Sequence, residues 1–460
     1  MTTGSADVAV PGVADRVDRL IAEQEQAFLR RQTRSAQLIE RAGEVLAGGA
    51  TSNWQIAQPQ AVWLSHGRGS KLYDVDGTEY VDMHGGYGAS IAGHAHPAIV
   101  AAVSDRVRRG THFAQPTEDA IVVATELRRR FDLPLWRFAN SGTEATMDAV
   151  HLMRAATGRD LIIKVEGCYH GHHDSVQVSV LPGAGEIGPR DHPTGVPGNT
   201  GIPAAIRDLV VVVPFNDLDA VERALAEHRG RIAGMILEPV MMNAGIILPR
   251  PGYLAVLREL LHAEGALLTF DEVKTGFTTG PGGITARSGV TPDLVTLAKA
   301  LGGGIAVAAL GGTRQVMSLI ADGSYEQVGT FNGNPLAMAA AQATLTEVLD
   351  DAGYDRLDAL AARLRARLEA EIAAAATGWQ VVTVGAKGCV TFTSRPVREY
   401  RDFLTIDDRL GHAHWLIQHN GGVFLPPWGK VEQWLISVQH EESDVDRLAA
   451  NFATLVGRVS

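Results

Sequence analysis

The sequence of 460 residues has little of three things: cysteine, excess positive charge and long apolar runs. Its two cysteines, Cys168 and Cys389, provide no disulfide framework, and so few cysteines are typical of a reducing compartment. The formal net charge of −11 disfavours nucleic acid and anionic membranes as partners. No uninterrupted apolar stretch is long enough to cross a bilayer, so we expect no membrane association.

The N-terminus also lacks the features of a secretory signal. Residues 1–11 are small and polar, with neither a basic region nor an apolar core, and we expect the first dozen residues to be disordered. Hydrophobic residues make up 45% of the chain and charged residues 20%, which is typical of a globular protein. We therefore expect a cytoplasmic protein, long enough for two or three domains.

Short apolar runs alternate with helical patterns through the middle of the chain. This alternation predicts an α/β fold with a mostly parallel, doubly wound sheet. The expected strands are 136–139, 161–165, 209–213, 234–238, 267–270, 294–297 and 306–310, with helices such as 219–228 and 253–264. We also expect a helix over 14–46 and a hairpin within 63–82. The predicted divisions are an N-terminal segment (1–75), a large domain (76–343) and a smaller α+β unit (344–460).

An acid and a lysine follow the ends of two neighbouring predicted strands. Asp271 comes directly after the run 267–270, and Lys299 comes just past the run 294–297. In open parallel sheets, the cleft outside the carboxyl ends of the strands is where ligands bind. A lysine amine forms a Schiff base with an aldehyde cofactor, and a carboxylate keeps the ring nitrogen of pyridoxal protonated. Taken alone, the pair is explained equally well by unrelated surface loops.

Residues 141–144, Ser-Gly-Thr-Glu, form a capping box at the start of a predicted helix. The free amides and the positive dipole end of such a helix also bind phosphate. Capping alone explains this run, so both interpretations stay open. Thr330 precedes another predicted helix, 336–349, and offers either a turn or a second phosphate contact.

The stretch 166–174 contains three histidines and an aspartate, which suggests a zinc site. However, the spacing does not match the usual helical two-histidine motif, and no cysteine pair supports it, so we predict no metal. Tyr169 in this stretch suits stacking on an aromatic cofactor.

Residues 183–188 match the pattern G-x-G-x-x-G and follow a strand-like run, 176–181. Pro189 and Pro193 break the helix that the dinucleotide fingerprint requires, so we reject NAD. The stretch 182–203 is a long Gly/Pro-rich loop of the kind that is either disordered or a functional lid.

Together these stretches resemble the class III pyridoxal-phosphate aminotransferases of fold type I. Within that family the chain is most similar to the glutamate-1-semialdehyde 2,1-aminomutases. The similarity runs from about residue 40 to 450 and also includes 74–77, 93–97, 238–240, 270–273 and 329–335. It implies a large domain with a mostly parallel sheet, a smaller domain formed by the N- and C-terminal segments, and a homodimer with shared active sites.

The resemblance also implies roles for individual residues. Lys299 would carry the internal aldimine and move the proton, and Asp271 would pair with the pyridinium nitrogen. Lys274 is a rival lysine that lies beyond the strand-end acid in the family's pattern. The other implied cofactor contacts are Ser141, Gly142 and Thr143 at the phosphate with Thr330 of the partner subunit, Tyr169 and Val273 on the ring faces, and His170, Glu238 and Asn243 nearby.

One departure bears on the reaction. In the aminomutases an arginine soon after paired glycines binds the substrate carboxylate, and its place falls here on Gln55, beside Trp54. Tyr87 stands where the aminomutases have tryptophan. A neutral amide cannot replace the charged fork of arginine, and the loss costs roughly 1.5–3 kcal/mol, about ten- to a hundredfold in affinity.

We therefore expect intermolecular transamination between an amine or amino acid donor and a carbonyl acceptor, with Trp54, Gln55 and Tyr87 as substrate contacts. The alternative is intramolecular amino transfer of the aminomutase type. A catalytically silent cofactor-binding protein is a third possibility, against which the intact Asp271 and Lys299 speak. Trp428 and Trp434 either line an apolar pocket or pack in the core.

Overall fold

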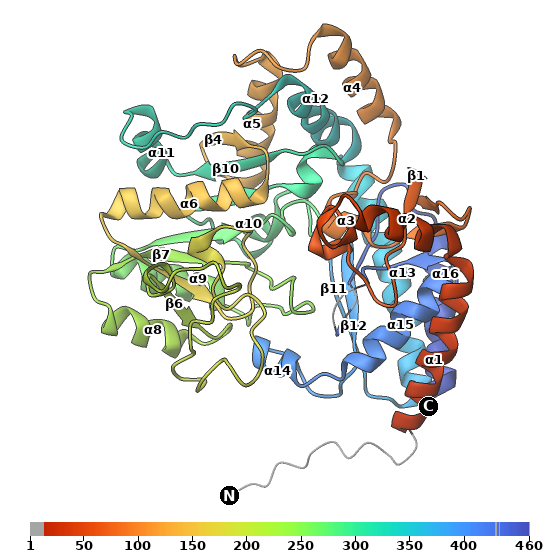
Figure 1. Ribbon diagram of the computed structural model, residues 1–460. Coiled ribbons are helices and arrows are strands. Elements are labelled where there is room, and N and C mark those ends of the chain that lie inside the picture. Colours follow the sequence, from red (N-terminus) through yellow and green to blue (C-terminus); the bar gives the residue numbers. More distant parts are fainter. Residues whose placement is uncertain (1–12, 428–429, 432, 460) are drawn as a thin grey trace, which may run out of the picture.

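The computed structural model describes residues 13–427, 430–431 and 433–459 and shows two packed parts (Figure 1). The larger part contains a seven-stranded sheet in the order β4-β10-β9-β8-β7-β5-β6. Only β10 runs antiparallel to its neighbours, which confirms the mostly parallel sheet. The strands are β4 (Leu135–Ala139), β5 (Leu161–Val165), β6 (Val210–Val213), β7 (Ile232–Leu237), β8 (Leu267–Asp271), β9 (Leu294–Leu297) and β10 (Ala308–Gly312).

Helices cover both faces of this sheet. Helix α6 (Gly142–Thr157) packs against β7 to β10, whereas α8 (Leu218–Glu227) and α9 (Tyr253–Ala263) pack against β6 and β8. Their crossovers run in opposite directions along the sheet, and right-handed crossovers then place the helices on opposite faces. The other helices of this part are α4 (Pro97–Arg109), α5 (Glu118–Phe131), α7 (Ala204–Arg207), α10 (Gly283–Ser288), α11 (Arg314–Ala321) and α12 (Pro335–Ala343).

The smaller part brings the two ends of the chain together. Helix α1 (Val13–Arg31) packs against α15 (Asp408–Asn420), and α16 (Glu442–Val459) packs against α13 (Asp351–Ala375) (Figure 1). The remaining elements are α2 (Thr33–Gly43), α3 (Gly85–Gly88), α14 (Tyr400–Leu404), the sheet of β1 (Leu64–Arg68), β2 (Lys71–Asp74), β3 (Glu79–Asp82) and β13 (Val423–Phe424), and the sheet of β11 (Gln380–Val384), β12 (Lys387–Thr391) and β14 (Gln433–Leu435).

None of the helices in the described ranges is both long and apolar enough to cross a membrane. The division of the chain at residues 75 and 343 stays a prediction, as does the disorder of the first twelve residues, which lie outside the described ranges.

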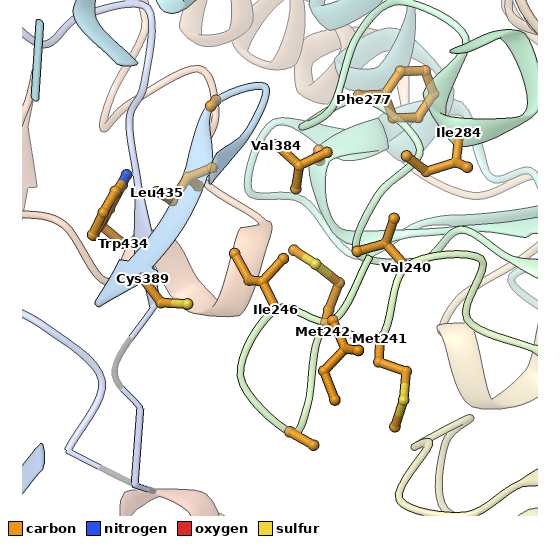
Figure 2. Close-up of a cluster of buried hydrophobic side chains, with 14 of the residues drawn as sticks. Val240, Met241, Met242, Ile246, Phe277, Ile284, Val384, Cys389, Trp434 and Leu435 are labelled. Atoms are coloured by element: carbon orange, nitrogen blue, oxygen red, sulfur yellow. The ribbon is translucent and has the colours of Figure 1, made fainter. Parts of the chain in front are cut away.

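An apolar cluster joins the two parts directly behind the site described below. Figure 2 shows Met242 and Ile246, on the loop after β7, facing the C-terminal sheet that carries Cys389 and Leu435. Trp434 is fully buried in this cluster and lines neither of the cavities near Lys299, so its role is packing. Trp428 lies outside the described residues.

Three expected elements differ from the structure for local reasons. The predicted helix 14–46 is interrupted at Gln32, whose buried side chain donates to Asp74, while the Asp76 carboxylate accepts the amides that begin α2. The predicted helix 336–349 changes to a π-helical turn at 344–348. The run 176–181 forms no strand, and only Val178 makes an isolated bridge, to Pro197.

The Gly/Pro-rich loop, 182–203, is attached to the C-terminal segment. Arg401 on α14 donates to both carboxylate oxygens of Glu166 at 2.9 and 3.0 Å, and to the carbonyls of Ile187 and Gly188. Arg190, inside the loop, pairs with Glu399 and Asp217. The Arg401 pair is enclosed, with Glu166 only 1% exposed, whereas Arg190 is half exposed.

These two arginines should therefore differ in their contribution to stability. Arg401→Ala leaves the Glu166 carboxylate buried without its partner, which should cost about 3 kcal/mol. Arg190→Ala removes an exposed pair and should cost less than about 1 kcal/mol. Thermal unfolding and limited proteolysis of the loop measure both. Equal losses in the two variants would contradict this account of the loop.

Candidate active site

Asp271 and Lys299 lie together because β8 and β9 run parallel. Asp271 ends β8 and lies opposite Thr296 of β9, and Lys299 follows three residues later. Both line one cavity of about 330 Å³ at the carboxyl edge of these strands. The structure thus brings the two residues into a single cleft.

The backbone at Lys299 turns sharply to aim the side chain. Its φ is +50°, the left-handed region that residues other than glycine rarely adopt, which costs on the order of 1 kcal/mol. Burial lowers the pKa of the Lys299 amine, although Asp271 and Glu238 act in the opposite direction. A lowered pKa increases the fraction of neutral amine, the form that attacks carbonyl carbon and accepts protons.

The Asp271 carboxylate is held by three donors. His170 Nδ1 lies 2.7 Å from Oδ2, while the Val273 amide and the Thr296 hydroxyl donate to Oδ1 at 3.0 and 3.2 Å. Asp271 is 5% exposed, and His170 is 1% exposed. A carboxylate so restrained presents a fixed negative charge to the cavity.

The start of α6 forms another wall of the same cavity. The Ser141 hydroxyl accepts from the Glu144 amide, and Glu144 accepts from the Ser141 amide, so the predicted capping box is present. A Cβ on Gly142 would come within 3.0 Å of Val273, which explains the glycine at this close approach. Ser141, Gly142 and Thr143 all line the cavity.

A chain of hydrogen bonds holds Glu238, Asn243 and Lys274, which also line this cavity. Glu238 accepts from the Tyr169 amide at 2.9 Å and from the Asn243 side chain at 2.9 Å. Asn243 in turn accepts from Lys274 Nζ at 2.7 Å, and Lys274 also donates to the Met242 carbonyl. Burial lowers the pKa of Lys274 well below its usual value. Lys274 lines the cavity but donates to protein groups, whereas Lys299 Nζ makes no hydrogen bond with any residue in the described ranges.

A second and larger cavity of about 1090 Å³ adjoins the first, sharing Tyr169, Asn243 and Lys274 in its lining. Trp54 and Tyr87 border it, their rings 5.1 Å apart, and the Trp54 ring lies 5.5 Å from that of Tyr169. The Gly/Pro-rich loop closes another side of this space, through Pro182 and residues 196–199. The Lys299 cavity is therefore adjoined by a larger cavity that is bordered by aromatic side chains.

Two of the predicted site residues lie elsewhere. Gln55 lines neither of these cavities, because its amide oxygen accepts from the Thr51 amide and hydroxyl. Thr330 is exposed and does not line the Lys299 cavity of its own chain. Its role in a partner's site stays a prediction.

Sequence reasoning missed Lys387, which lines the larger cavity from β12. A single lysine in an apolar strand matches no motif, so no sequence signal marks it. Of the histidines near Tyr169, His170 forms a hydrogen bond with Asp271. Within the described ranges, no three His, Cys, Asp or Glu side chains gather closely enough to hold a metal ion.

The sequence matches the family model "Aminotransferase class-III" over residues 55–436. The glutamate-1-semialdehyde 2,1-aminomutase of Nitratidesulfovibrio vulgaris is 39% identical over 430 residues, covering 92% of this chain and 99% of the relative. Among solved structures, an omega-transaminase from Sphaerobacter thermophilus has a TM-score of 0.87 at 36% identity, covering 92% of this chain and 97% of the other. A glutamate-1-semialdehyde-aminomutase from Pseudomonas aeruginosa PAO1, in complex with PMP, has a TM-score of 0.88 at 29% identity, covering 97% and 99%. The motifs, the fold and these comparisons agree: the chain belongs to the class-III aminotransferase family.

Proposed function

We propose that this chain is a pyridoxal-phosphate-dependent transaminase that moves an amino group from an amine or amino acid donor to a carbonyl acceptor, with Lys299 as its catalytic amine. The observation that carries the proposal is the shared cavity of Lys299 and Asp271 beside the start of α6. Family membership supports the enzyme class, and the PMP-bound relative supports the cofactor.

The residues lining the smaller cavity fit pyridoxal 5'-phosphate. Ser141, Gly142 and Thr143 would hold its phosphate, because a helix start offers free amides and a positive dipole end. Tyr169 and Val273 would contact the two ring faces, and Asp271 would face the ring nitrogen. Glu238 and His170 would act through their bonds to the Tyr169 amide and Asp271, while Asn243 would lie near the ring's polar edge.

When bound, the cofactor supplies an aldehyde that condenses with amines and a ring that withdraws electrons from the amine carbon. Lys299 takes a proton at that carbon and returns it, and its lowered pKa makes the neutral amine available. Asp271 would place its negative charge beside the ring nitrogen.

Aminomutase-type transfer within one molecule is the second candidate, favoured by the 39% identity to a relative of that name. The position of Gln55 disfavours it, because its amide is bonded to Thr51 and carries no charge. The first half-reaction separates the two: a transaminase releases a free carbonyl product, and an aminomutase retains the intermediate until the amine has moved.

We further propose a cytoplasmic homodimer in which Thr330 reaches the partner's phosphate site. The support is an exposed apolar surface around Thr330: Val328 is 82% exposed, Phe331 57% and Phe113 47%. Exposed apolar side chains gathered in this way mark association surfaces. His112 and Phe331 contact each other with ring centroids 4.8 Å apart, so Phe113 follows a residue that touches the Thr330 segment.

Lys299→Ala should abolish turnover without unfolding the protein. Borohydride reduction of the wild-type holoenzyme should leave the cofactor mass on the tryptic peptide that contains Lys299, and no labelled peptide should appear in the variant. Lys274→Ala is the matched control, and it should keep the Lys299 label. A label on Lys274, or substantial turnover by Lys299→Ala, would refute the assignment.

Asp271→Asn and Glu272→Gln should separate catalysis from structure at two adjacent acids. Glu272 accepts from the amides of Ile284 and Thr285, so its loss should lower the melting temperature. Asp271 faces the cavity, and an unpaired ring nitrogen should reduce kcat more than a hundredfold, since breaking a buried charge pair costs about 3–5 kcal/mol. Stopped-flow half-reactions and thermal melts measure both. An Asp271→Asn rate within tenfold of wild type would exclude the proposed role.

Mixed dimers test the shared site. Thr330→Ala alone should weaken cofactor binding by about tenfold, the typical value of one lost hydrogen bond to a charged group. Refolding it together with inactive Lys299→Ala chains should restore activity, because one of the two sites then has both residues. If Thr330 serves its own chain, the mixture stays as weak as the Thr330→Ala homodimer.

A further inference from the structure

Lys387 is a buried lysine that pairs with no side chain in the described part of the chain. It is 2% exposed yet lines the larger cavity, and its Nζ makes no hydrogen bond or ion pair with any of the residues the structure describes. Lys164 donates to three backbone carbonyls and Lys274 donates to Met242 and Asn243, while the nearby carboxylates of Asp271 and Glu238 act on Lys299. An unpaired buried ammonium is costly, so its presence indicates a ligand that supplies the missing charge.

The direction of the Lys387 side chain follows from the strand. Cys389, two residues later on β12, lies on the same face, because side chains alternate along a strand. Figure 2 shows Cys389 facing Ile246 on the loop after β7, and the Ile246 backbone contacts its thiol. Lys387 therefore points to the side where this loop and Gln433 border the large cavity.

Two lysines, Lys274 and Lys387, line the large cavity. Burial, and then the charge of Lys299, lower the pKa of Lys387 to about 7. The charge of Lys387 in turn contributes to lowering the pKa of Lys274 and of His84, which burial lowers most. Lys274 and Lys387 thus share the large cavity, and the charge of Lys299 in the adjoining cavity acts on both.

The acids near this cluster are already engaged. Glu238 is bonded to the Tyr169 and Met242 amides, and Asp271 to His170. Glu186 lines the outer side of the cavity on the Gly/Pro-rich loop, where it is exposed and accepts from the Gly183 amide. No described carboxylate pairs with Lys387.

We propose that Lys387 binds the carboxylate of the substrate, so that the enzyme takes amino acids as donors and oxo acids as acceptors. The inference rests on the proposed function and names its substrate class. It also assigns the charged contact that Gln55 cannot make to a strand of the smaller part, β12. A carboxylate in the large cavity would pair with the ammonium while the amine carbon approaches Lys299 in the adjoining one.

The test compares donors that differ only in a carboxylate. Alanine is paired with isopropylamine, and 3-amino-3-phenylpropanoate with 1-phenylpropylamine, each acid having a carboxylate where the amine has a methyl group. The measured quantity is the ratio of kcat/KM for acid over amine in half-reactions of the holoenzyme. Lys387→Met, which keeps the length and removes the charge, should lower this ratio ten- to a hundredfold, chiefly through KM.

Two control variants accompany this measurement. Lys430→Met removes a lysine that donates to two carbonyls and lines neither cavity, and it should leave the ratio unchanged. Lys387→Arg should restore part of it. The melting temperature of Lys387→Met should equal or exceed that of wild type, whereas a merely structural lysine would lower it. An unchanged ratio in Lys387→Met, or a wild-type enzyme that accepts amines but no amino acid, would overturn the proposal.

A binding measurement separates this inference from the proposed function. Calorimetric titration of the holoenzyme with 3-phenylpropionate and with its amide needs no turnover. The wild type should bind the carboxylate at least tenfold more tightly, and Lys387→Met should bind both alike. Preserved discrimination in the variant rejects the Lys387 site. Absence of the cofactor label on Lys299 rejects the proposed function, whatever this titration shows.

Discussion

The parallel register between β8 and β9 is the constraint on which the site depends. It sets Asp271 opposite Thr296, so that the Thr296 hydroxyl donates to the carboxylate, and Lys299 follows three residues after Thr296. A one-residue slip would move every side chain of β9 to the other face. The left-handed backbone conformation of Lys299 then sets the direction of its side chain. The packing of β9, which is buried along its length, offsets the conformational cost.

The buried charged groups of the site are compensated by neighbouring residues. Glu238 organises the Tyr169 and Asn243 wall, and through Asn243 it places Lys274, while Asp271 balances Lys299 across the smaller cavity. Each of these buried charges has partners within hydrogen-bonding distance or an opposite charge nearby. Lys387 is the exception among the described residues, and it lines the larger cavity.

Sequence analysis predicted those features that are encoded by short, periodic or motif-bearing segments. The β8 and β9 strands, the capping box at α6 and the acid–lysine pair are all of this kind, and Ser141 to Glu144 form their cap from neighbouring residues alone. What it missed depends on distant partners. The helix breaks at Gln32 because the side chain of Gln32 donates hydrogen bonds to Asp74 and Tyr80. The run 176–181 forms no strand ladder, since its only bridge among the described residues is the one between Val178 and Pro197.

Lys387 is a candidate site residue that the sequence could not reveal, for the same reason. In sequence it is one polar residue between Ala386 and Gly388, and only the packing of the C-terminal sheet against the loop after β7 places it beside the catalytic cavity. Under the proposed function the two parts of the molecule have separate roles: the large sheet would supply the reacting amine and the cofactor contacts, and the smaller part would supply charge at the substrate's other end. Substrate choice can then change through β12 while the β8–β9 register, and with it the chemistry, stays fixed.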